Sequence, residues 1–94
     1  MLYVIDQDGL SIIPIKKNDV ITVKEINSQK GCRYLVRKER RKRRDGAVVY
    51  DWLGTYTTSK ETTEVVKRLA AARICSFPDN TFKMPSNGFL GENY

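Results

Sequence analysis

The chain contains no histidine, and this absence removes the residue that serves most often as a general base and as a metal ligand. It contains only two cysteines, Cys32 and Cys75, which are too few and too far apart for a zinc-site spacing. No glycine-rich phosphate loop of a standard form occurs either. These absences argue against a catalytic or metal centre. We predict a protein that is not an enzyme and that needs no cofactor.

Long apolar runs are missing as well. None approaches the roughly 18 residues that cross a membrane as a helix, so no membrane partner is expected. The opening residues MLYVIDQDG carry acids where a signal peptide would carry cations. We therefore expect a cytoplasmic protein in a reducing compartment, with Cys32 and Cys75 as free, buried thiols.

What the chain does contain is the composition of a folded domain. Its 94 residues, 40% hydrophobic and 30% charged, suffice for one core and leave no room for a second domain. We predict a single domain over residues 1–85. Residues 86–94 contain two glycines and show no periodicity, which predicts a flexible C-terminal tail; the alternative is a docking segment for a neighbour.

Short β-strands are predicted through the first half of the chain. Asp8-Gly9 is a strong hairpin signal, and the stretch VITVKEI is rich in β-branched residues. The stretch CRYLVRKE alternates, which places Arg33, Leu35 and Arg37 on one face of a strand. The predicted strands lie in residues 2–15 (two strands), 20–26, 32–39, 47–56 and, as a short final strand, 81–85.

One helix is predicted, in the stretch TTSKETTEVVKRLAAARIC. Thr58 and Glu61 fit a capping box, which starts a helix. Val65, Leu69 and Ala72 form one narrow apolar stripe at helical spacing, as in a helix that packs on a sheet. The predicted fold is therefore α+β, an antiparallel β-meander of about five strands packed against one C-terminal α-helix.

Three segments carry a resemblance: YVIDQDG at the start, LGTYTTSKETTEVVKRLAAA in the middle, and FKMP near the close. In these segments and their order the chain resembles a family of small uncharacterised proteins from phages and prophages of Gram-positive bacteria. The resemblance covers most of the chain. It implies a shared fold, and it implies no activity and no catalytic residues. The chain departs from the family pattern in a long basic hairpin, where a shorter and less charged turn is expected.

The most unusual stretch is RKERRKRR at residues 37–44, which holds seven cations and one glutamate. The remaining residues contain equal numbers of positive and negative side chains, so this basic run accounts for the whole net charge of +6. The protein is thus a neutral domain with one concentrated positive patch.

A two-residue turn at Asp45-Gly46 would pair the basic run with the following strand. In that register Arg40 lies opposite Asp51 and can form an ion pair with it. The other face would interleave arginines with aromatic rings, namely Arg37, Arg41, Arg43, Tyr50, Trp52 and Tyr56. Cations bind phosphates and aromatic faces stack on exposed bases, and a two-stranded ribbon also fits the DNA major groove.

We therefore predict contacts with the phosphate backbone of DNA or RNA, with weak sequence specificity. The predicted nucleic-acid-binding residues are Arg37, Lys38, Arg40, Arg41, Lys42, Arg43, Arg44 and Tyr50. Two alternatives stay open. In one, the patch docks an acidic protein partner, which makes the chain a structural or host-modulating interaction module. In the other, the cations are the solvated end of a hairpin whose aromatic residues belong to the core. The sequence leaves the oligomeric state undefined.

Overall fold

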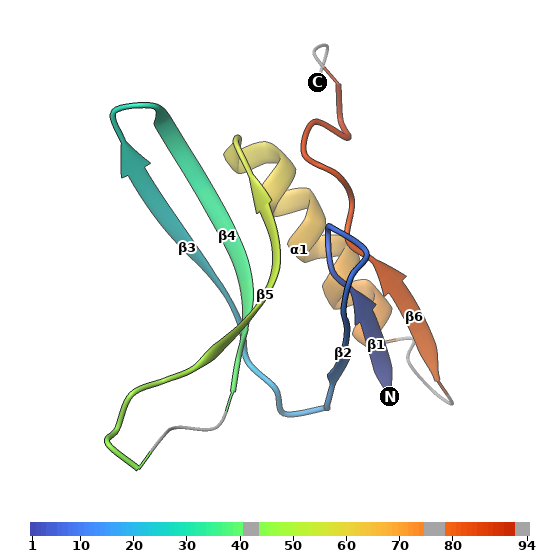
Figure 1. Ribbon diagram of the computed structural model, residues 1–94. Coiled ribbons are helices and arrows are strands. Elements are labelled where there is room, and N and C mark those ends of the chain that lie inside the picture. The colour runs from blue at the N-terminus through green and yellow to red at the C-terminus, as the bar shows by residue number, and fades with distance from the viewer. Residues whose placement is uncertain (41–43, 75–78, 92–94) are drawn as a thin grey trace.

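The computed structural model describes residues 1–40, 44–74 and 79–91 (Figure 1). Its elements are β1 (Leu2–Ile5), β2 (Ile12–Ile15), β3 (Ile21–Ser28), β4 (Gly31–Glu39), β5 (Tyr50–Tyr56), α1 (Ser59–Ile74) and β6 (Asn80–Lys83). The predicted α+β class, an antiparallel meander packed against one helix, is confirmed. The predicted final strand is also present, as β6.

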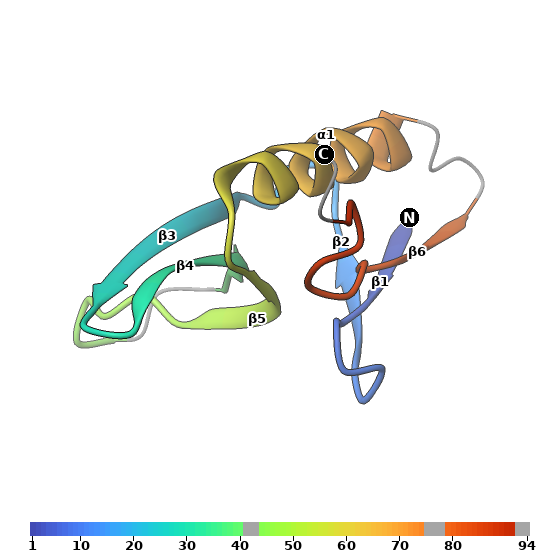
Figure 2. The ribbon, with the colours of Figure 1, turned by 90° about the horizontal axis from the view of Figure 1, so that it is seen from above.

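The strands form two three-stranded sheets, in the orders β2-β1-β6 and β3-β4-β5. β1 pairs antiparallel with β2, and the turn between them contains Gly9 at a φ of 73°, which suits glycine. β1 also pairs parallel with β6, and a parallel pair requires a long crossover connection. The chain between β1 and β6 runs through β2, the β3-β4-β5 meander and α1. In Figure 2 the meander lies to the left of the first sheet and α1 lies at the top of the view.

The core lies where the two sheets and the helix meet. All three supply fully or nearly fully buried side chains: Leu2, Val4, Ile13, Ile15, Val36, Leu53, Tyr56, Val65, Leu69 and Met84. The predicted helical stripe is confirmed, because Val65 and Leu69 are buried and Ala72 packs against the cluster. The predicted cap is also present: the Thr58 hydroxyl accepts the Glu61 N–H at 3.2 Å.

A β-bulge in β5 decides which of its side chains enter the core. Gly54 and Trp52 pair with consecutive residues of β4, so Leu53 is the extra residue of the bulge. Leu53 and Tyr56 are three positions apart and would face opposite sides of a regular strand, yet both are fully buried. The bulge allows both to reach the core, and it leaves Trp52 on the opposite face of the sheet.

The predicted register of β4 and β5 is therefore wrong. Glu39 pairs with Tyr50 instead of Trp52, a shift of two residues, and the ladder ends at this pair. One more backbone bond follows, from the Arg40 N–H to the Val49 carbonyl at 2.6 Å. The strand also begins at Tyr50, later than the predicted start. Burial of the β5 side chains determines the register of the two strands, and the Asp45-Gly46 turn signal does not.

The Asp45-Gly46 turn is nevertheless formed locally. Gly46 has a φ of 86°, and the Asp45 carboxylate accepts the Ala47 N–H at 3.0 Å. With the ladder ending at Glu39 and Tyr50, this turn cannot be the two-residue connection that the sequence predicts.

The described part of the predicted tail lies against the body of the protein. The Phe89 ring meets the Tyr56 ring edge-on, with centroids 6.2 Å apart. The Leu90 N–H donates to the Glu61 carboxylate at 3.4 Å. Residues 86–91 thus contact both β5 and the start of α1, and residues 92–94 lie outside the described chain.

Cys32 is a free thiol, as predicted, but it is partly exposed rather than buried. Its sulfur donates to the Glu25 carboxylate at 3.3 Å on the neighbouring strand. Cys75 lies outside the described residues.

Candidate nucleic-acid interface

The structure divides the predicted binding residues among different environments. Arg37 and Tyr50 lie on the open face of the β3-β4-β5 sheet, Lys38 turns toward the other sheet, and Arg40 and Arg44 lie at the end of the hairpin. Three further residues of the basic run, Arg41, Lys42 and Arg43, lie outside the described residues.

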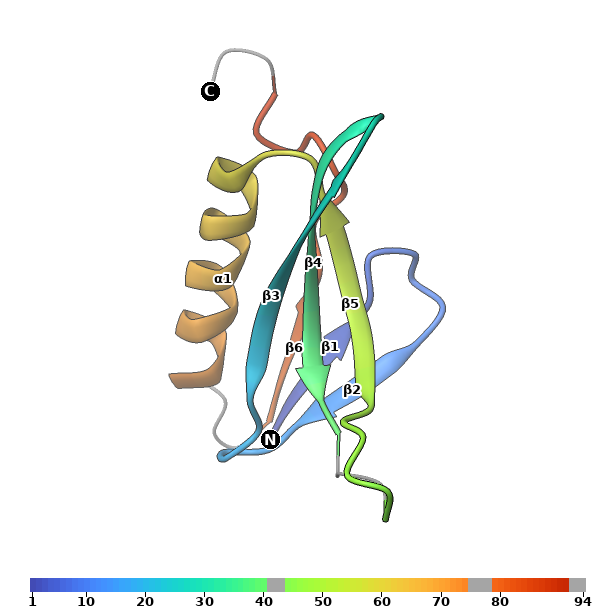
Figure 3. The ribbon, with the colours of Figure 1, turned by 90° about the vertical axis from the view of Figure 1, so that its left-hand side faces the viewer.

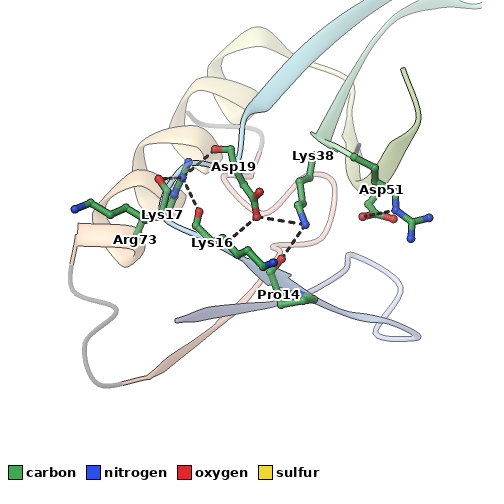
Figure 4. Close-up of polar contacts among 8 residues, drawn as sticks. Pro14, Lys16, Lys17, Asp19, Lys38, Asp51 and Arg73 are labelled. Atoms are coloured by element: carbon green, nitrogen blue, oxygen red, sulfur yellow. Dashed lines mark hydrogen bonds and ion pairs between the residues drawn. The ribbon is translucent and has the colours of Figure 1, made fainter. Parts of the chain in front are cut away.

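Lys38 links the two sheets. Its ammonium group donates to the Pro14 carbonyl at 3.0 Å and forms an ion pair with Asp19 at 3.3 Å, and only 14% of its side chain is exposed (Figure 4). The same carboxylate accepts the Lys16 N–H at 2.6 Å. Burial raises the pKa of Asp19, but the Lys16 hydrogen bond and the Lys38 charge outweigh it and hold the pKa below its ordinary value. The Lys38 ammonium is thus occupied by contacts within the protein, unlike the exposed cations at the end of the hairpin.

Lys16 and Asp19 belong to the connection between β2 and β3, and a residue of α1 also binds this connection. The Arg73 guanidinium donates to the carbonyls of Lys16, Lys17 and Asp19 at 3.1, 3.0 and 2.9 Å. Figure 4 shows Arg73 and Lys38 approaching this connection from different sides. Lys38 of β4 is therefore tied to β2 and to the β2–β3 connection, and the same connection is tied to α1.

Arg40 forms the predicted ion pair with Asp51, with 3.6 Å between Nε and Oδ2. The contact is diagonal, because Asp51 pairs with Lys38 in the ladder. The Arg40 side chain is 60% exposed, and an exposed pair of this length contributes little stability. A phosphate can therefore compete for the guanidinium at low cost. Arg44 is exposed and forms no ion pair within the part of the chain that the structure describes.

Arg37 lies over an aromatic ring on the open face. Its guanidinium carbon is 3.6 Å from the centre of the Tyr50 ring, a close cation–π contact. Its Nε donates to the Thr22 hydroxyl at 3.4 Å. Trp52 is the ladder partner of Arg37, and its indole N–H donates to the Thr55 hydroxyl at 2.8 Å. The first two contacts restrain Arg37 and the third restrains Trp52; Arg37, Tyr50 and Trp52 lie on one face of the sheet, and all three remain partly exposed.

The predicted interleaving of cations and rings is thus confirmed for Arg37, Tyr50 and Trp52. It is wrong for Tyr56, which is fully buried and donates its hydroxyl to the Pro85 carbonyl at 2.7 Å. Burial and the nearby Glu61 carboxylate raise the pKa of Tyr56 well above its ordinary value, as expected for a core phenol.

Two cations outside the basic run share the open face. Arg33 lies on the face of Leu35 and Arg37 by the alternation of β4, as the sequence indicated, and it is exposed. Lys24 is exposed and lies opposite Leu35 in the β3–β4 ladder. No sequence signal marks Lys24, because its place depends on the register between two strands.

A groove of about 620 Å³ lies beside the base of the hairpin. It is lined by Lys16, Asn18, Asp19, Val20, Lys38, Glu39 and Arg40. Asp19 and Glu39 offset two of its three cations, so this groove is a weak candidate for an anion site, and the open face and the hairpin end carry the stronger positive charge.

Comparisons with known proteins add no identification. A scan against protein-family models found no match, and searches of curated proteins and of solved structures found none either. Within residues 1–40, 44–74 and 79–91, no three metal-binding side chains come together, and no helix is long and apolar enough to cross a membrane.

Proposed function

We propose that this protein is a non-enzymatic domain that binds the phosphate backbone of nucleic acid through the β4–β5 hairpin. The observation that carries the proposal is the concentration of charge: one run of eight residues supplies the whole net charge of +6. The last residue of this run and the residues that follow it, 44–49, extend beyond both sheets at the lower left of Figure 1.

The described cations of the hairpin support this proposal, because their guanidinium groups are accessible to a phosphate. Among the described residues, the Arg40 side chain is held by one long ion pair at an exposed site, and Arg44 is exposed. Crowded like charges repel one another, and one or two lysines or arginines would suffice to prevent edge-to-edge aggregation. Binding of a polyanion would relieve this repulsion. It would also release the counterions condensed on the phosphates, and this release is favourable in entropy.

The first test is fluorescence anisotropy with labelled duplex and single-stranded oligonucleotides at about 50 mM and about 200 mM salt. We expect binding at low salt that weakens strongly at the higher salt, because each phosphate contact contributes about −0.9 to the slope of log affinity against log salt. Lack of binding to either nucleic acid at low salt would overturn the proposal. A pull-down would then test the acidic protein partner.

A pair of matched variants locates the surface. The double change Arg40→Gln and Arg44→Gln should weaken binding and flatten the salt slope by about 1.8, which is the loss of two phosphate contacts. The control is Lys60→Gln with Lys67→Gln, which removes the same charge from exposed positions of α1. Equal losses in both variants would mean that net charge, and not the hairpin, determines binding.

A further inference from the structure

We infer that the open face of the β3-β4-β5 sheet stacks the bases of single-stranded nucleic acid, so that the protein prefers single strands to duplex. This inference rests on the proposed function and adds the class of nucleic acid. Its surface, called here the stacking face, consists of Arg37, Tyr50 and Trp52 with the flanking cations Lys24 and Arg33.

The first element of the stacking face is a preformed flat cation. The Arg37 guanidinium covers the Tyr50 ring at 3.6 Å and is also hydrogen-bonded to Thr22, so two contacts restrain its plane. A guanidinium plane is one of the surfaces on which unpaired bases stack. Because Tyr50 already holds Arg37 in place, less side-chain freedom is lost when a base arrives.

The second element is Trp52, which lies opposite Arg37 in the ladder. The bulge at Leu53 gives it this position, and the hydrogen bond to Thr55 at 2.8 Å ties its indole to the sheet. Base–aromatic stacking contributes about 1–3 kcal/mol per base and tolerates any sequence, since every base has a π face. An aromatic ring that served only the core would be fully buried like Tyr56, whereas Trp52 remains partly exposed.

The third element is access. Figure 3 shows β3, β4 and β5 in front of the first sheet, with α1 beside β3 and no described element over this face. Lys24 and Arg33 are exposed on the same face and can follow a backbone that leaves the rings. The positions of Arg33 and Arg37 in β4 are separated by roughly 14 Å, so the charge extends along the strand and is not a single point.

The geometry favours a single strand for a physical reason. In a duplex the base faces are covered by their neighbours, and only edges and phosphates are accessible; in a single strand the faces can be presented to aromatic and guanidinium planes. The hairpin cations attract both kinds of nucleic acid, and only a single strand gains from the stacking face.

The experiment uses the full chain and an oligothymidylate of about a dozen nucleotides, compared with a duplex of equal length at one salt concentration. Trp52 is the only tryptophan, so its fluorescence reports directly on the stacking face. We expect tighter binding of the single strand and quenching of Trp52 on titration. Equal affinity for both, without quenching, would overturn the inference and leave the proposed function standing; no binding to either would overturn both.

Variants separate stacking from charge. Tyr50→Leu keeps the net charge but removes the ring that holds the Arg37 guanidinium, so it should weaken single-strand binding about twofold to fivefold, with little change for duplex. Arg37→Lys keeps the charge without the planar guanidinium and should lower the same preference. The control is Tyr3→Leu, which removes a partly exposed ring from β1 in the other sheet. A preference for single strands that survives both changes would contradict the inference.

Discussion

The two faces of the β3-β4-β5 sheet are built from the same strands and differ in what they hold. The inner face buries Val36 and Tyr56, joined by Leu53 of the bulge, against the first sheet and α1. The outer face leaves Arg37 and Trp52 partly exposed. The contrast teaches that stability and binding should respond to different residues, although these residues are neighbours in the same two strands.

The largest effect should come from the inner face. Leu53→Ala removes a fully buried side chain from the bulge, and we expect the free energy of unfolding to fall by about 2–5 kcal/mol through lost burial and a residual cavity. Urea denaturation measures this change. Oligonucleotide affinity, measured where the variant is still folded, should stay close to that of the parent.

The neighbouring change Trp52→Leu is the matched control on the outer face. It should cost clearly less stability, because the ring lies outside the buried cluster, and it should weaken single-strand binding. Similar losses of stability in the two variants would place Trp52 in the core and remove the distinction between the faces.

A second effect concerns Asp19, which joins the inner side of the hairpin to the first sheet. Its pKa is depressed in the folded protein, so its contribution to stability is present above its ordinary pKa of about 3.8 and is lost as the pH falls through the lower folded-state pKa. Asp19→Asn should cost about 1–2 kcal/mol at neutral pH, since charged hydrogen bonds to Lys16 and Lys38 weaken.

The measurement is the free energy of unfolding of parent and variant between pH 7 and pH 3. The difference between them should shrink as the pH falls below about 4, because protonation removes from the parent the charge that the variant already lacks. Asp79→Asn is the control, since that carboxylate pairs with the N-terminus at an exposed site. A constant difference across the pH range would mean that the Asp19 charge does not link the sheets.

Much of the fold followed from local patterns, and the rest required contacts between distant residues. The cap at Thr58, the stripe containing Val65 and the Asp8-Gly9 hairpin are properties of neighbouring residues, so the sequence predicts them. The bulge lets Leu53 and Tyr56 both join the buried cluster that includes residues of the first sheet and α1. No local pattern contains that information.

The candidate site shows the same limit. The alternation in β4 correctly placed Arg33 and Arg37 on one face, which is a local property. The alternation could not show that Lys38 contacts Pro14 and Asp19. Pro14 lies in β2, and Asp19 lies in the connection from β2 to β3. A cation in a basic run is therefore available to a ligand only where it forms no hydrogen bond or ion pair with a distant part of the chain.

The smallest expected effect concerns a negative charge on the outer face. Glu39, the one acid of the basic run, pairs with Tyr50 beside Arg37, so its charge should repel a strand bound there. Glu39→Gln should leave stability within about 0.5 kcal/mol and raise oligonucleotide affinity about twofold to threefold at low salt, the effect of one unit charge roughly 7 Å away in water. The salt slope should stay the same, because no phosphate contact is gained.

The control is Glu64→Gln on α1, which changes the net charge by the same amount away from this face. An equal gain in both variants would assign the effect to net charge, whereas a gain confined to Glu39→Gln places the bound strand on the outer face.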